Sequence, residues 1–361
     1  MDAQMNGKRL PELDVMRTMA IAIIVFHHLS DYTFNYYRFD FMGLNFDLSF
    51  IHGLNADLAV GVFIFISGML HGPSFAAGHD APPVSAYIRK RFLRIYPLYL
   101  LSFFLFMLEF GYYPGARFIA VHLLGLQVLL ANGPHSEFPT IWFIGLLVAY
   151  EAVFLITLKY GTSRPGKTAI IAGAFCACLV AKLYAGVVDE RFFEYYALYW
   201  IGIFGAGFLF GLDRRFKTVI IAAALAAAYV YAKDLYAVSP ERLLKTRPVY
   251  WLEFFITTNV IMLGFTMFAH GLGAMAAASG SAARAFFRQA AFASYAVYLF
   301  HRHVWYAMLL LYRPGNGLAR LIYLSAAGIP VIALLSWLIQ SLYDRLTGRP
   351  RASAPPVVAL R

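Results

Sequence analysis

Apolar runs that are long enough, or nearly long enough, to cross a membrane recur along the whole of this 361-residue chain. A helix needs about 20 residues to span the hydrocarbon core of a bilayer. The candidate runs lie near residues 13–30, 55–71, 96–110, 139–159, 168–187, 196–212, 217–232, 250–275, 292–312 and 321–343. The sequence therefore predicts an all-α, polytopic membrane protein with about ten transmembrane helices.

The composition supports this class and argues against others. Hydrophobic residues make up 61% of the chain and charged residues 14%, whereas a soluble domain has about half and about a quarter. The net charge of +11 could suggest nucleic acid, but the basic residues lie in short clusters between apolar runs, so we expect no nucleic-acid partner. Neither the two cysteines nor the scattered histidines have a metal-ligand spacing, so we predict no metal site.

The distribution of basic residues predicts the orientation. Residues 116–131 form an eleventh apolar run, but it is short and contains His122 and Gln127. If this run does not span and the N-terminus is cytoplasmic, the cytoplasmic segments hold 18 Lys and Arg residues and the outer loops hold 9. Cytoplasmic loops carry such an excess in membrane proteins. We therefore expect both termini in the cytoplasm, a single integral domain over 1–343, and a short, disordered cytoplasmic tail over 344–361.

The first apolar run carries ionisable residues at both ends. If 13–30 is a helix, Arg17 and His28 lie about three turns apart on one face, separated by ~16 Å along the axis. Asp14 lies one turn before Arg17, and Asp31 lies one turn after His28 if the helix extends that far. Ionisable groups inside a span cost several kcal/mol and usually face a cavity or a partner.

A histidine beside a carboxylate is typical of a general base, because the carboxylate orients the imidazole and stabilises its charged form. On this interpretation His28 is the base and Asp31 its partner, while His27 is turned ~100° away. The alternative is that both histidines are interfacial residues near a helix end. The stripe of Asp14, Arg17, His28 and Asp31 is also compatible with a secondary transporter or channel that uses it as a proton or substrate path.

Four blocks share a recognisable order and spacing: "LDVMRTMAIAIIVFHH", "GVFIFISGML", "RKRFLRIYPLYL" and "SYAVYLFH". The third has the pattern R-x-x-R-x-x-P, with Arg91 and Arg94, and the fourth has S-x-x-x-Y-L-x-H, with Tyr298 and His301. Together with an Arg eleven positions before a His in the first block, they resemble the acyltransferase 3 family of integral membrane acyltransferases.

A fifth block, "IWFIGLLVAYEAVF", is similar to the family's Trp-led middle helix, but less closely. Some members place a Glu five positions after the Trp. Here Trp142 is followed at that position by Leu147, and the acidic residue is Glu151. Trp142, Glu151, Tyr298 and His301 are candidate substrate or cavity residues on this resemblance. For His301 we leave open interfacial anchoring and a role as a second site histidine.

The resemblance implies an O-acyltransferase of the bacterial inner membrane. Its donor would be acetyl-CoA or another acyl-CoA, and its acceptor a hydroxyl of a carbohydrate, a lipid-linked glycan or another surface molecule. His28 would act as general base or as a covalent acyl relay, with Asp14, Arg17 and Asp31 around it.

Two further motifs have roles under this resemblance. Arg91 and Arg94 would bind the phosphates of coenzyme A, which arginine binds through paired hydrogen bonds. Ser67-Gly68, in the second block, could supply a nucleophile. No G-x-S-x-G elbow surrounds it, so we favour a close helix-packing site.

Overall fold

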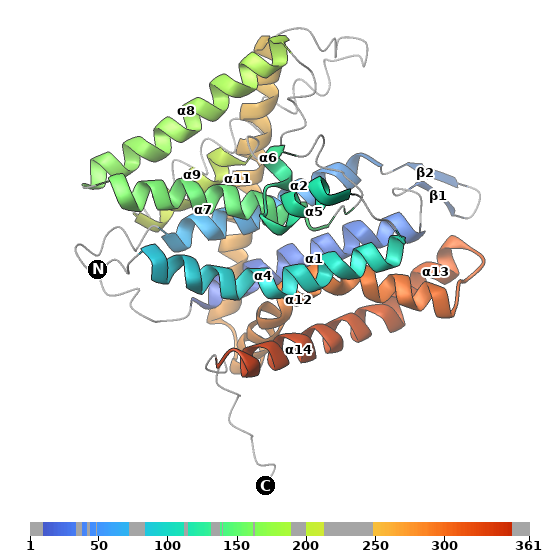
Figure 1. Cartoon of the computed structure of the whole chain (residues 1–361). Coiled ribbons are helices and arrows are strands. Elements are labelled where there is room, and N and C mark those ends of the chain that lie inside the picture. The colour runs from blue at the N-terminus through green and yellow to red at the C-terminus, as the bar shows by residue number, and fades with distance from the viewer. Residues whose placement is uncertain are drawn as a thin grey trace. The chain divides into compact units, whose positions relative to one another are not determined.

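The computed structural model describes residues 10–33, 38–41, 44–47, 49–71, 84–111, 115–130, 138, 140–161, 163–188, 200–212 and 248–348 (Figure 1). The helices are α1 (Pro11–Thr33), α2 (Ser49–His71), α4 (Val84–Phe110), α5 (Gly115–Leu123), α6 (Gln127–Leu130), α7 (Trp142–Tyr160), α8 (Arg164–Val188), α9 (Ile201–Leu212), α11 (Pro248–Ala278), α12 (Ser281–Leu311), α13 (Gly317–Tyr323) and α14 (Ile329–Leu346). The prediction of an all-α fold is confirmed. A small antiparallel hairpin, β1 (Arg38–Phe41) and β2 (Leu44–Asp47), lies in the first predicted outer loop.

Three described helices are long and apolar enough to cross a membrane: Pro11–Thr33, Val84–Glu109 and Gly317–Leu346. Four shorter apolar helices accompany them, at Asp57–His71, Trp142–Thr157, Ile201–Gly211 and Ile261–Ala276. The predicted run at 217–232 lies outside the described residues. The run at 116–131 is two short helices, α5 and α6, separated by a turn in which Gly125 has a φ of 68°. A nine-residue helix such as α5 is far too short to span.

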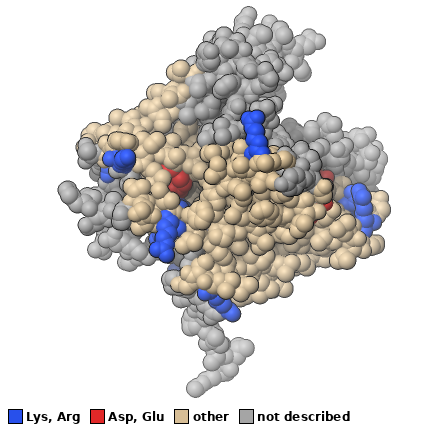
Figure 2. Space-filling view, viewed as in Figure 1, with Lys and Arg blue, Asp and Glu red and all other residues tan. Residues whose placement is uncertain are grey.

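The outer surface of the helices is apolar where a soluble protein would be polar. In α14 the inward positions recur every three or four residues and include polar side chains: Ile332, Ser336, Gln340 and Tyr343. The exposed positions are large and apolar: Leu334, Leu335, Leu338 and Leu342. Figure 2 shows the same preference, with charged side chains in a few separate groups on the face in view. Lipid is the solvent that such a surface suits.

The helices form two compact units, and α2, α4 and α11 contribute to both. The first unit contains residues 60–94 and 113–268. Within it α2 and α9 approach closely through glycines. A Cβ on Gly68 would lie 2.1 Å from the backbone oxygen of Phe204, and one on Gly207 would lie 2.2 Å from that of Phe65. Small residues allow membrane helices this approach, which agrees with the packing interpretation of Ser67-Gly68.

The second unit contains residues 6–59, 95–112 and 269–361. Its core is α12, against which α1 and α14 pack (Figure 1). Between α13 and α14 the helix widens into a π-turn, Leu324–Gly328. Trp305 of α12 lies against this turn, and its Nε1 donates a hydrogen bond to the backbone oxygen of Leu324 at 3.3 Å. Such π-turns are frequent near functional sites, and this one packs beside the cluster described next.

Candidate functional site

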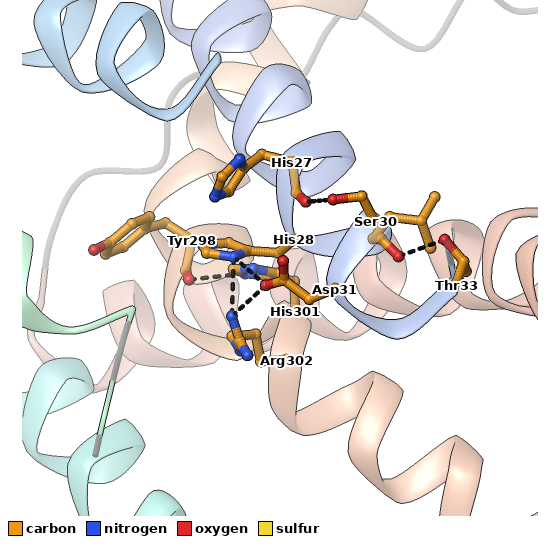
Figure 3. Close-up of polar contacts among 9 residues, drawn as sticks. His27, His28, Ser30, Asp31, Thr33, Tyr298, His301 and Arg302 are labelled. Carbon is orange, nitrogen blue, oxygen red and sulfur yellow. Dashed lines mark hydrogen bonds and ion pairs between the residues drawn. The ribbon is translucent and has the colours of Figure 1, made fainter. Parts of the chain in front are cut away.

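In the second unit four polar side chains meet where the last turns of α1 lie beside α12 (Figure 3). We call His28, Asp31, His301 and Arg302 the His28 cluster. The helix α1 extends to Thr33, so Asp31 lies one turn after His28, as the sequence predicted. Nδ1 of His28 is 3.2 Å from Oδ2 of Asp31. Nη1 of Arg302 is 2.9 Å from the same Nδ1 and 3.1 Å from the same Oδ2.

These contacts allow two proton arrangements on His28. A guanidinium has only donors. If Arg302 donates to Nδ1, the proton of the neutral imidazole is on Nε2, and Asp31 accepts from Arg302 and not from His28. If instead the proton is on Nδ1, His28 donates it to Asp31. In both arrangements Asp31 and Arg302 lie against Nδ1, and only in the second does Nε2 hold the lone pair that a base or nucleophile needs.

Arg302 is held by more than its two polar contacts. Its guanidinium carbon lies 5.4 Å from the centre of the Tyr32 ring, within the range of a cation–π interaction. The Tyr32 ring in turn meets Trp305 edge-on, with centroids 5.7 Å apart. Arg302 was not among the site residues predicted from the sequence. The available signal was a charge within the apolar run 292–312, where ionisable residues are usually functional.

The ring of His301 stacks on that of His28, with centroids 5.2 Å apart and planes 25° apart. Its Nδ1 lies 2.9 Å from the backbone oxygens of Val297 and Tyr298, so Nδ1 carries a hydrogen and donates it to them. A neutral histidine in this tautomer has a lone pair on Nε2. His301 is fully buried, and among the described residues that Nε2 has no hydrogen-bond partner. The structure thus places His301 beside His28 and away from an exposed anchoring position.

A neighbouring network in the same unit has the residue types of a catalytic triad. Nδ1 of His303 lies 2.6 Å from Oε1 of Glu109, and its Nε2 lies 2.9 Å from Oγ of Ser102. Ser102, however, donates its hydroxyl hydrogen to the backbone oxygen of Leu299, at 3.0 Å. The serine is completely buried and its one proton has a backbone acceptor. This network therefore ties α4 to α12 and does not present a nucleophile.

At the other end of α1, Asp14 and Arg17 form a pair of their own. Nη1 of Arg17 lies 3.8 Å from Oδ1 of Asp14, and Asp14 is buried. Thr18 donates to the backbone oxygen of Asp14 at 2.8 Å. The predicted stripe on α1 thus consists of two local pairs, Asp14 with Arg17 and His28 with Asp31.

The first unit contains a second polar group, which we call the Arg91 cluster: His71, Tyr87, Arg91 and Glu151. Nη2 of Arg91 is 2.9 Å from Oε1 of Glu151, and Nε2 of His71 is 3.1 Å from the same oxygen. Tyr87 donates to Oε2 of Glu151 and accepts from Nε of Arg91, the latter at 3.0 Å. The His71 ring stacks on Phe154, with centroids 3.8 Å apart.

This cluster brings together two predicted residues, Arg91 and Glu151, and two that sequence analysis missed. His71 and Tyr87 had no distinguishing spacing, because their partner Glu151 is far away in the chain. Arg94, one turn after Arg91 on α4, is exposed. Trp142 begins α7 and stacks on Trp200, with centroids 5.5 Å apart. No group of three or more metal-ligating side chains is found among the residues that the structure describes.

A family model described as an acyltransferase domain, that of the acyltransferase 3 family, matches residues 10–340. No curated protein and no solved structure matches the chain. The matched range contains every residue of the His28 cluster and of the Arg91 cluster.

Proposed function

Because this chain belongs to the acyltransferase 3 family and is a polytopic membrane acyltransferase, we propose that it transfers an acyl group, acetyl above all, from cytoplasmic acyl-CoA to a hydroxyl of a carbohydrate or another cell-surface acceptor. The observation that carries the proposal is the His28 cluster. It holds an imidazole, a carboxylate and a guanidinium together inside an apolar helix pair. Such a costly arrangement is usually functional.

The chemistry of the reaction requires a group such as His28. A hydroxyl has a high pKa and attacks a thioester slowly unless a base accepts its proton. A neutral imidazole, with an ordinary pKa near 6.5, is suited to that task at neutral pH. His28 therefore acts either as the general base or as a relay that carries the acyl group between donor and acceptor. Asp31 and Arg302 orient the ring in both cases.

We assign donor binding to Arg91 and Arg94. Coenzyme A carries several phosphate charges, which pair well with guanidinium groups. Arg94 is exposed, whereas Arg91 is paired with Glu151, so a phosphate would compete with that carboxylate for Arg91. The excess of basic residues on one side, 18 against 9, supports cytoplasmic termini. With that orientation both arginines would lie on the side where acyl-CoA occurs.

Membrane vesicles test donor class and orientation together. In inverted vesicles, whose cytoplasmic face is outward, added radiolabelled acetyl-CoA should label a membrane or luminal acceptor as an ester. Right-side-out vesicles should give little label, because acetyl-CoA does not cross the bilayer. Protease access to a tag after Arg361 reports the orientation of each preparation.

The same experiment tests the transporter alternative, in which the ionisable residues of α1 form a proton or substrate path. A transporter would leave the acyl group unattached to any acceptor, and every radiolabelled product would be free acetate or intact acetyl-CoA. Ester label in right-side-out vesicles alone would contradict the orientation.

Alanine variants of the two arginines test donor binding. Arg94→Ala should weaken acetyl-CoA binding about tenfold or more, because a charge-assisted hydrogen bond contributes roughly 1.5–3 kcal/mol. Arg91→Ala should do the same, and it should also destabilise the protein, because it leaves the carboxylate of Glu151 without its closest cation. Titration calorimetry of the purified protein measures the affinity.

Two companion variants make this result interpretable. Glu151→Gln in the Arg91→Ala background removes the stranded charge, so stability should recover while the affinity for acetyl-CoA stays low. Arg89→Ala, in the same basic segment, should bind acetyl-CoA as the wild type does. Unchanged affinity in Arg91→Ala and Arg94→Ala would contradict a role in donor binding. Both residues would then be ordinary members of the excess of basic residues in cytoplasmic segments.

A further inference from the structure

His301 has a buried acceptor atom that the fold leaves unused. Its Nδ1 hydrogen is donated to the backbone of α12, which leaves the lone pair on Nε2. No partner for that atom is found among the described residues, although the residue is completely buried. A buried polar atom without a partner costs free energy. A hydroxyl group of a bound molecule would satisfy it.

Arg302 restricts the protonation state of Nδ1 of His28 during the reaction. A guanidinium only donates, and its Nη1 lies 2.9 Å from Nδ1. An imidazole that carries an acyl group on Nε2 has a lone pair on Nδ1 and no hydrogen there. The contact from Arg302 therefore suits an acylated His28. When the acyl group leaves, the ring gains electron density, which the adjacent positive charge stabilises.

Asp31 suits the other half of the reaction. With the hydrogen on Nδ1 and donated to Asp31, 3.2 Å away, the lone pair of His28 is on Nε2 and can attack a carbonyl. The two contacts at Nδ1 cannot both be hydrogen bonds in a neutral ring that carries its hydrogen there. Each matches one of two successive states of His28, before and after acylation.

Resting on the acyl transfer proposed above, we propose that the two stacked histidines divide the reaction, with His28 carrying the acyl group on Nε2 and Nε2 of His301 accepting the proton of the acceptor hydroxyl. In the first step Nε2 of His28 attacks the thioester, the carbon–sulfur bond breaks, and coenzyme A leaves with the proton that Nδ1 gives up. In the second step the acceptor oxygen attacks the acyl carbon. The carbon–nitrogen bond breaks, the hydroxyl proton goes to His301, and it then returns to His28, so both rings end neutral.

The stacked geometry of the rings supports this division. Their centroids lie 5.2 Å apart, so a group bonded to one ring is close to the other. Trp305 meets His301 edge-on at 5.5 Å and fixes its position. The acceptor is defined only by its chemistry: it supplies a hydroxyl that donates to Nε2 of His301.

A half-reaction assay on the purified full-length protein separates the two steps. Radiolabelled acetyl-CoA is added without acceptor, and the free thiol released and the label retained on the protein are measured. Wild type and His301→Asn should both release about one coenzyme A per chain, because the first step does not use His301. His28→Ala should release none. His27→Asn, the neighbouring histidine on α1, should behave as wild type.

The second step is then tested with two kinds of nucleophile. Hydroxylamine attacks acyl imidazoles without a general base, so His301→Asn should transfer acetyl to it at the wild-type rate. That result would also show that the variant is folded and acylated. Transfer to the acceptor present in membranes should fall by roughly 10²–10⁴-fold, the usual worth of a general base. A second variant, His301→Gln, should give the same pattern.

Three outcomes would overturn the inference. If wild type transfers acetyl to membranes but, without acceptor, shows no burst of released coenzyme A and no retained label, His28 does not carry the acyl group. The proposed function would still stand, with His28 as the general base. If both His301 variants serve the membrane acceptor at the wild-type rate, His301 is not the base. If both lose the burst as well, His301 does not act in the second step alone. The proposed function itself fails only if wild-type protein transfers no acyl group to either nucleophile.

Discussion

His28→Ala is expected to lower acyl transfer by at least 10²–10⁴-fold, the usual worth of general-base assistance, and His27→Ala is expected to leave most of it. The reason is angular. His28 shares a face of α1 with Asp31 and lies beside Arg302, whereas His27 is rotated ~100° from it around the same helix. The two variants are compared at matched expression by transfer of radiolabelled acetyl in membranes.

Supporting variants refine the comparison. His28→Ala should still bind acetyl-CoA, because donor binding is assigned to Arg91 and Arg94. Asp31→Asn should cause a smaller loss than His28→Ala, because Arg302 still contacts Nδ1 of His28. An inactive His27→Ala with an active His28→Ala would mean that the assignment of the catalytic histidine is wrong by one residue. Full activity in both would show that neither histidine is the catalytic base or relay.

The second large effect concerns folding. Gly68→Ala should lower the thermal unfolding temperature sharply, or prevent folding, because the added Cβ would lie 2.1 Å from the backbone oxygen of Phe204 and 2.9 Å from the backbone nitrogen of Phe208. Both are backbone atoms of α9, so relief requires the whole helix to move. Overpacking typically costs about 1–3 kcal/mol, and a backbone clash belongs at or above the upper end. Size-exclusion chromatography after heating in detergent measures the loss.

A matched glycine provides the control. A Cβ on Gly173, in α8 of the same unit, meets nothing within 4 Å, so Gly173→Ala should be neutral or stabilising by up to about 1 kcal/mol through helix propensity. Ser67→Ala should retain activity if Ser67-Gly68 is a packing site. A wild-type unfolding temperature for Gly68→Ala would show that α2 and α9 do not cross as closely as described. An inactive but stable Ser67→Ala would restore the serine as a candidate nucleophile.

Local properties of the chain were predictable from sequence. Whether a segment forms an apolar helix depends on its own residues, so α1 and α7 lie close to their predicted runs, whereas α12 begins eleven residues before the predicted run 292–312. The pairing of His28 with Asp31 was also predictable, because both lie on one helix at a spacing of three residues. The break between α5 and α6 follows from the short, polar-interrupted run at 116–131. The orientation and the tail beyond residue 348 stay predictions.

The tertiary structure decided which partners each ionisable group contacts. His301 and Arg302 are more than 270 positions from His28 in the chain, and Glu151 is 80 positions from His71. No helical spacing relates such residues, because their contacts depend on which helices pack together and at which rotation. The sequence alone determined that this chain spans a membrane and carries a histidine–carboxylate pair on its first helix, since both follow from neighbours within one helix. Only packing decided that the pair meets an arginine and a second histidine whose lone pair is buried, because those contacts form between helices far apart in the chain.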